Sequence, residues 1–156
     1  MKARMKHPAL VVPGAMPALL GLGTAVTTSA VENGIPMRTL HLVELRASQI
    51  NGCSVCVMMH ARDAEAAGET PKRIYSVAAW RESPLFTKAE RAALELTESM
   101  TRRQDRGDAV SDEIWGEAAQ HYSEEGLAVL VVAISMINLW NRLNASTRQV
   151  AEEMAA

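Results

Sequence analysis

Residues 51–60 read Asn51-Gly52-Cys53-Ser54-Val55-Cys56-Val57-Met58-Met59-His60, and they hold both cysteines of the chain and a histidine four positions after the second. The Asn-Gly pair is typical of a turn, and no helix breaker follows it until Gly68. Alanines at several later positions favour a helix. We therefore expect a helix from about Cys53 to Ala67. On it, Cys53 and Cys56 share one face at i, i+3, and Cys56 and His60 share one at i, i+4.

This helix would bring the two thiols together in a setting that favours redox chemistry. The i, i+3 spacing places the two Cα atoms roughly 5–6 Å apart, which a disulfide tolerates. The free amides and the positive dipole end of the first turn favour a thiolate over a thiol. The imidazole of His60 is near enough to take the proton. The pattern predicts a redox-active dithiol.

A Cys-x-x-Cys pair alone has other interpretations. In a thioredoxin fold it follows a strand within a βαβ unit, and no such alternation is visible in this sequence. A zinc site would need two further ligands, for which His60 and His41 are the candidates, but the usual paired histidines or second Cys-x-x-Cys are absent. Two buried, inert cysteines beside a hydrogen-bonded histidine are the third alternative.

Composition limits the class of protein. The chain has 156 residues, of which 48% are apolar, enough for one domain with a core. A net charge of −2 provides no basic field for nucleic acid. Two cysteines on one helix do not make the disulfide framework of a secreted scaffold, and they fit a reducing compartment. We therefore expect a cytoplasmic protein that binds no nucleic acid.

The N-terminus superficially resembles a signal peptide, because three basic residues precede an apolar stretch at 9–26. Prolines and glycines interrupt that stretch, and no convincing Ala-x-Ala cleavage site closes it. We therefore expect residues 1–35 to form a packed N-terminal arm and helix.

Helical periodicity, caps and breakers predict an all-α fold of seven or eight helices in a single domain, residues 1–156. Pro36 suits a first helical turn, Thr70 and Pro71 suit an N-cap and N1, and residues 87–90 form a capping-box pattern, Thr-Lys-Ala-Glu. The expected helices cover about 16–31, 36–48, 53–67, 71–80, 88–101, 112–121, 127–140 and 145–156.

Residues 127–140 are apolar on nearly every side. Their length and the absence of turns favour a helix over a strand. We expect the helix to be too short, and too interrupted by Ser135 and Asn138, to span a membrane. A helix with this composition must be buried, and in so small a domain that predicts a partner subunit. We therefore expect a homo-oligomer with no membrane contact.

Leu45-Arg46-Ala47-Ser48-Gln49-Ile50 leads into residues 51–60, and the combined stretch closely resembles the signature of the alkyl hydroperoxidase D family, within the carboxymuconolactone decarboxylase superfamily. Other segments resemble the same family in order and spacing: Gly68-Glu69-Thr70, Ala78-Ala79-Trp80-Arg81-Glu82, Phe86-Thr87-Lys88-Ala89-Glu90-Arg91-Ala92-Ala93-Leu94 and Asn138-Leu139-Trp140-Asn141-Arg142-Leu143-Asn144. The resemblance covers about residues 36–148, which would form the core of the domain.

The resemblance implies a helical fold assembled into trimers or hexamers, and a peroxidase that uses no metal and no cofactor. It implies that Cys56 attacks a hydroperoxide with help from His60, that Cys53 resolves the sulfenic acid, and that an external dithiol or redoxin restores the pair. True decarboxylases of the superfamily lack the cysteine pair, which argues against lactone decarboxylation. The alternatives are a non-peroxidatic redox sensor or binding protein, or a carboxymuconolactone decarboxylase-like enzyme.

The sequence departs from the family pattern at two positions. The family commonly has a glutamate twelve residues before the first cysteine, where this chain has His41, and its best-described members have a histidine just before the second, where this chain has Val55. Glu44 follows His41 by one helical turn. We therefore predict a proton relay Glu44–His41–His60–Cys56; the alternative is that Glu44 is a solvated surface carboxylate.

Overall fold

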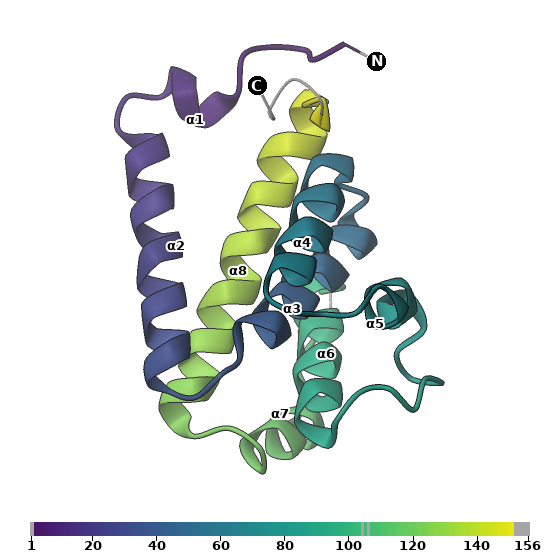
Figure 1. The fold of residues 1–156 in the computed structure, drawn as a ribbon. Helices are drawn as coiled ribbons and strands as arrows, with labels where there is room; N and C mark the ends of the chain where they lie inside the picture. The colour runs from purple at the N-terminus through teal and green to yellow at the C-terminus, as the bar shows by residue number, and fades with distance from the viewer. Residues whose placement is uncertain (1, 104, 106, 152–156) are drawn as a thin grey trace.

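A computed structural model describes residues 2–103, 105 and 107–151. Over those residues it contains eight α-helices, one short 3₁₀ helix and no strand, which confirms the predicted all-α class (Figure 1). The elements in chain order are α1 (Pro8–Val11), α2 (Ala15–Glu32), α3 (Met37–Asn51), α4 (Ser54–Ala66), α5 (Pro71–Ser76), η1 (Val77–Ala79), α6 (Lys88–Thr101), α7 (Asp112–Ala119) and α8 (Glu124–Thr147).

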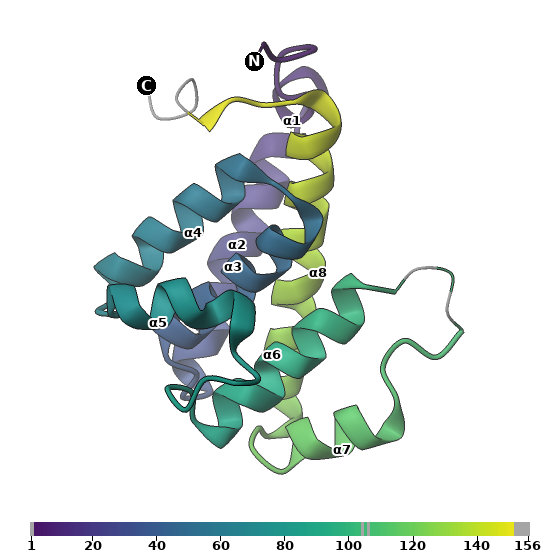
Figure 2. The ribbon, with the colours of Figure 1, turned by 90° about the vertical axis from the view of Figure 1, so that its right-hand side faces the viewer.

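Helix α3 is the centre of the arrangement, since it contacts α2, α4, α6, α8 and η1. Its neighbour α8 runs the length of the molecule, with α2 on one side and α3 on the other (Figure 1). The 90° view shows α4 and α5 on the near face and α6 and α7 toward one end (Figure 2). The N-terminal arm returns to the end of α8, where the Arg4 amide donates to the Thr147 carbonyl at 2.9 Å.

The core divides around α3. Leu40 and Val43 pack with α2, α6 and α8, whereas Leu42 and Leu45 pack with Ile74, Val77, Trp80 and Leu94 beneath α5 and η1. Each of these four α3 residues is at most 1% exposed. A helix that is buried on several faces cannot rotate or slide without breaking two clusters at once, so α3 is a rigid support for the residues at its C-terminal end.

Most of the predicted boundaries agree with the structure. Thr87 forms the predicted capping box with Glu90, and Thr70 and Ser111 cap α5 and α7 with their side chains. Pro36 is the N-cap of α3 rather than part of its first turn. The helix expected at 71–80 divides into α5 and η1, and α1 was not predicted.

The predicted separate helix at 145–156 is wrong over the described residues. Helix α8 continues to Thr147, because Asn141, Asn144 and Thr147 extend its buried face, and it ends at Arg148 in a left-handed conformation (φ 53°). Residues 152–156 of that prediction lie outside the described residues. The expectation that this helix is too short to span a membrane is wrong, because α8 has 24 residues and contains an 18-residue window of mean hydropathy 1.6. That window is 56% buried within the protein, as in a core helix.

Candidate active site

The two cysteines form a disulfide at the start of α4. Gly52 ends α3 in the left-handed conformation (φ 65°), which a glycine adopts without strain, and this turn leads directly into Cys53. Cys53 is the N-cap of α4, and its sulfur accepts from the Cys56 amide at 3.3 Å. The Cα atoms of the disulfide-bonded pair lie 5.4 Å apart, within the predicted range. The helix begins one residue later than expected, with Cys53 as its N-cap and Cys56 in its first turn.

The disulfide is buried: Cys56 is fully covered and Cys53 is 2% exposed. Ala47, Val55 and Ile137 pack around the two cysteines, and Trp140 and Ala151 lie against the same cluster. A thiol or peroxide can therefore reach the sulfurs only when some of these neighbours move.

His60 lies one turn after Cys56 on α4, 6% exposed, and faces a carboxylate from α3. Its Nδ1 atom is 3.1 Å from Glu44 Oε2, an ion-pair distance. Both ring nitrogens of His60 are buried, and neither makes a hydrogen bond among the described residues, so the approach of Nδ1 to Glu44 is an ion-pair contact. In the tautomer that directs Nδ1–H toward the Glu44 carboxylate, the lone pair is on Nε2, and this nitrogen can then act as a base.

Glu44 joins two histidines. Its Oε2 atom also accepts a hydrogen bond from His41 Nδ1 at 3.1 Å, and the two imidazole rings stack with centroids 6.3 Å apart. Glu44 is 6% exposed, so the alternative of a solvated surface carboxylate is wrong. Burial raises the pKa of Glu44, but the hydrogen bond from His41 and the interaction with His60 outweigh it and lower the pKa to about 2. Glu44 is therefore an anion at neutral pH.

The order of the predicted relay differs from the structure. The sequence placed His41 between Glu44 and His60, whereas Glu44 lies between the two histidines and contacts His60 directly. The physical reason is that the crossing of α3 and α4 brings the Glu44 carboxylate within 3.1 Å of His60 Nδ1, whereas the centroid of the His41 ring stays 6.3 Å from that of the His60 ring. The relay order becomes His41–Glu44–His60, and the roles of these residues in catalysis stay predictions.

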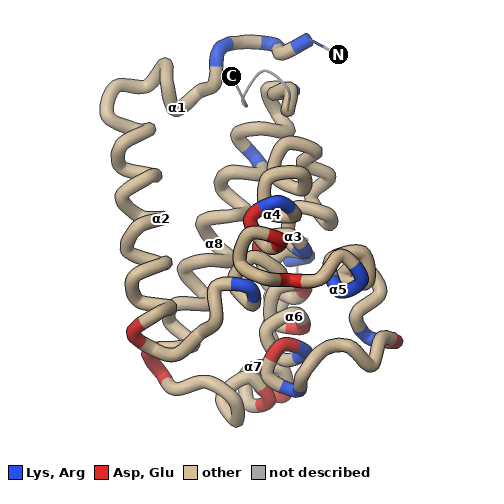
Figure 3. The backbone as a smooth tube through the Cα atoms, in the orientation of Figure 1, with Lys and Arg blue, Asp and Glu red and all other residues tan. Residues whose placement is uncertain are grey.

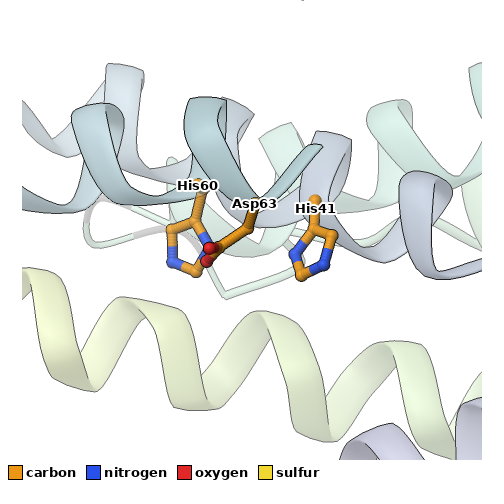
Figure 4. A group of neighbouring side chains, drawn as sticks. All are labelled: His41, His60 and Asp63. Carbon is orange, nitrogen blue, oxygen red and sulfur yellow. The ribbon is translucent and has the colours of Figure 1, made fainter. Parts of the chain in front are cut away.

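Three residues of this region carry atoms of the kind that bind metals. His41, His60 and Asp63 offer ligand atoms within 4.8 Å of one another, and Figure 4 shows these three side chains together. The Asp63 side chain is 46% exposed, and its Oδ2 atom is 3.9 Å from His60 Nδ1. Glu44 already lies against both histidines, so this arrangement has a role without an ion.

Asn144, for which the sequence predicted no role, also contacts the site. Its Nδ2 atom donates to Cys56 Sγ at 3.3 Å from α8, and it is 4% exposed. The available signal was the segment 138–144, in which asparagines recur at every third position along one helix face.

Comparison with known proteins places these residues in context. Residues 13–99 match the model of the carboxymuconolactone decarboxylase family, more than half of the chain and starting before the predicted core. The uncharacterised protein YdfG of Bacillus subtilis (strain 168) is 41% identical over 113 residues, 72% of this chain and 76% of YdfG.

Two solved structures are similar to the whole fold. Protein ATU0492 of Agrobacterium tumefaciens, of unknown function and described as a candidate antioxidant defence protein AhpD, superposes with a TM-score of 0.86 at 35% identity, over 96% of this chain and 97% of that one. The debrominase Bmp8, in a variant form bound to 2,3,4-tribromopyrrole, superposes with a TM-score of 0.77 at 21% identity, over 89% of this chain and 71% of Bmp8. At this identity the similarity shows the fold alone.

Proposed function

The chain belongs to the carboxymuconolactone decarboxylase family, and we propose that it is a thiol-dependent hydroperoxide reductase that uses the Cys53–Cys56 pair. The observation that carries the proposal is a disulfide at a helix N-terminus with an oriented, buried histidine one turn away. The family and the likeness to an AhpD-like structure establish the fold, and the peroxidase activity is the proposal.

The first step uses the reduced pair. The free amides of the first turn of α4 favour the Cys56 thiolate, and His60 Nε2 takes its proton. The thiolate attacks the distal oxygen of the hydroperoxide, the O–O bond breaks, and the leaving alkoxide takes the proton from His60 and departs as alcohol. Cys56 is then a sulfenic acid, oxidised by two electrons.

The second step closes the disulfide. The Cys53 sulfur attacks the Cys56 sulfur, the S–O bond breaks, and the hydroxyl leaves as water with the Cys53 proton. An external dithiol or redoxin then supplies two electrons by thiol–disulfide exchange and restores both thiols. Because both sulfurs are covered, we propose that this exchange needs local opening of the first turn of α4 or of the side chains over it.

Steady-state turnover tests the proposal. With excess cumene hydroperoxide as substrate and dithiothreitol as reductant, each protein molecule should reduce many molecules of hydroperoxide. One molecule of cumyl alcohol should form for each dithiothreitol oxidised. A cysteine pair that reacts only as slowly as a free thiol would consume hydroperoxide no faster than the uncatalysed background. The Cys53→Ser/Cys56→Ser double variant is the control for the uncatalysed background, and a rate equal to that background would refute the enzyme.

The proton path gives the second test. His60→Ala should slow Cys56 oxidation about a hundredfold, the low end of general acid–base effects. Glu44→Gln should slow it by a smaller factor, because an amide cannot stabilise the imidazolium as the carboxylate does, and His41→Ala should slow it least. Asp63→Asn is the matched control, since Asp63 lies next to His60 but is exposed. Wild-type rates across a pH series in both Glu44→Gln and His41→Ala would remove these two residues from the mechanism.

Removal of metal ions should leave the activity unchanged. The carboxylate of Glu44 already lies within 3.1 Å of an Nδ1 atom of each imidazole, and the proposed steps use only sulfur and proton chemistry. Dialysis against EDTA followed by a rate measurement checks this. A loss of activity that Zn²⁺ or Mn²⁺ restores would assign His41, His60 and Asp63 to a metal site instead.

We also propose that the chain forms a homo-oligomer of three or six copies. Helix α2 has no charged residue before Glu32 (Figure 3), and Leu20 and Val31 are 59% and 66% exposed. Beside it on α8, Val132 is 40% exposed, and a groove of about 500 Å³ runs between the two helices. Light scattering at micromolar concentration should give a molar mass three or six times that of the chain. The Leu20→Asp substitution should lower this molar mass. A monomer would contradict this.

A further inference from the structure

The buried side-chain amide of Asn144 contacts the sulfur of Cys56, and its oxygen has no hydrogen-bond partner among the described residues. Asn144 Nδ2 donates to Cys56 Sγ at 3.3 Å, whereas Asn144 Oδ1 is buried without a hydrogen-bond partner among the described residues. Buried polar atoms are rarely left unpaired, and an exception calls for an explanation that includes a catalytic role.

The amide is held in place by the polar face of α8. Asn141, one turn earlier, donates to Ser48 Oγ at 3.1 Å and accepts from Asn51 Nδ2 at 2.8 Å. Asn51 donates in turn to Asn138 Oδ1 at 2.9 Å. These bonds connect α8 to the end of α3 and to the turn that leads into Cys53, so the position of Asn144 relative to Cys56 is fixed from both sides.

We infer that Asn144 is a further catalytic residue of the proposed reaction, with Nδ2–H holding the Cys56 thiolate and Oδ1 accepting the hydrogen of the Cys56 sulfenic acid. The role of Oδ1 rests on the proposed function, since only a hydroperoxide reductase forms the sulfenic acid. The Nδ2–H bond strengthens when the disulfide is reduced, because a thiolate is a charged acceptor and a disulfide sulfur is a weak one. The Oδ1 atom acquires a donor only after Cys56 has received an oxygen from the peroxide, which accounts for its lack of a partner in the disulfide state.

The measurement that tests the inference is the pKa of Cys56 as the single thiol of a Cys53→Ser background, followed by thiolate absorbance. Loss of one hydrogen bond to a charged group should raise the pKa of Cys56 by about one unit in Asn144→Leu. Asn144→Asp keeps the shape and replaces the donor by an anion, so it should raise the pKa further. Circular dichroism establishes that each variant is folded.

Asn138→Leu is the matched control. It removes a buried amide from the same face of α8, but its hydrogen bonds go to Thr101, Ile134 and Asn51 and not to sulfur. The Cys56 pKa in this variant should rise much less than in Asn144→Leu, because the Asn141–Ser48 hydrogen bond and the Asn144–Cys56 contact both remain. An equal rise in Asn138→Leu and Asn144→Leu would mean general loosening of the site and would overturn the inference, as would an unchanged pKa in Asn144→Leu and Asn144→Asp.

The acceptor half is tested by trapping the sulfenic acid with dimedone after one equivalent of peroxide. The Cys56 sulfenic acid should persist several-fold longer in Cys53→Ser than in Cys53→Ser with Asn144→Leu, because Asn144 Oδ1 accepts a hydrogen bond from its hydroxyl. Equal lifetimes of the sulfenic acid in the two variants would overturn the role of Oδ1. A parent that does not react with peroxide at all would refute the proposed function together with this half, while the pKa series would still decide the role of Nδ2.

Discussion

Cys56→Ser should abolish hydroperoxide reduction, whereas Cys53→Ser should still react once and stop at a sulfenic acid on Cys56. Cys56 lies one turn before the oriented base His60 and accepts from Asn144, while Cys53 is the N-cap residue, whose sulfur already accepts from the Cys56 amide. Only Cys56 therefore has both a base within one turn and a side-chain donor. The sulfur that remains in Cys56→Ser should react with peroxide no faster than a free thiol.

Mass spectrometry after one equivalent of peroxide distinguishes the two cysteines. The expected result is a gain of one oxygen on Cys56 in Cys53→Ser, trapped by dimedone, and no rapid gain in Cys56→Ser. A sulfenic acid on Cys53, formed at the wild-type rate in Cys56→Ser, would reverse the assignment and make Cys53 the nucleophile, as in thioredoxin-like dithiols.

Glu98→Ala should be the most destabilising single change outside the core, at about 3–5 kcal/mol, because it removes one partner of a buried ion pair. Glu98 is 2% exposed and accepts from Arg46 Nε at 2.7 Å, Trp80 Nε1 at 3.0 Å and Arg81 Nη1 at 2.5 Å. These bonds join α3, the segment after η1 and α6. Without the carboxylate, Arg46 is left as a buried, uncompensated charge two residues from Ser48 and the asparagine network.

Urea unfolding measures this effect, and Glu95→Ala is its control. Glu95 lies one turn before Glu98 on α6 and pairs with Arg81 at 2.6 Å in a half-exposed position, so its loss should cost about 1 kcal/mol or less. Equal costs for the two variants would show that the Glu98 cluster does not hold the helices together.

The same residue sets a pH dependence. Burial raises the pKa of Glu98, and hydrogen bonds from Arg81, Trp80 and Arg46 outweigh it, so the pKa falls to about 2. A carboxyl whose pKa is lower in the folded state contributes its full stability above its unfolded pKa of 4.5, and loses it as pH falls toward 2. The loss of stability between pH 4.5 and 2 should therefore be shallower in Glu98→Ala than in wild type, as urea unfolding across this pH range would measure.

Local chemistry made much of the fold predictable. The dithiol helix expected from Cys53 to Ala67 is Ser54–Ala66, and the capping box at Thr87 begins α6. These features depend on residues within one or two turns of each other. The end of α8 was not predicted, because Arg148 lacks the usual glycine or proline signal and the helix continues along a buried polar face instead.

The site was predictable only in part. The residues Cys53, Cys56 and His60 lie in one helix and its N-cap, so spacing alone relates them. Whether Glu44 reaches His60 directly depends on how α3 crosses α4, which is set by the two apolar clusters around α3 and not by local sequence. Asn144 lies 88 positions from Cys56, and no spacing rule connects residues so far apart.

The most direct test of the proposed function is the rate at which the reduced protein forms its disulfide when mixed with hydroperoxide, followed by stopped-flow tryptophan fluorescence, since Trp140 packs against the cysteine cluster. The proposed mechanism predicts oxidation on the order of a hundredfold faster than that of dithiothreitol at the same pH, with His60→Ala slowed toward the dithiothreitol rate. Oxidation of the wild-type pair no faster than dithiothreitol would contradict it and leave a buried disulfide that acts as a slow switch or as a structural bond.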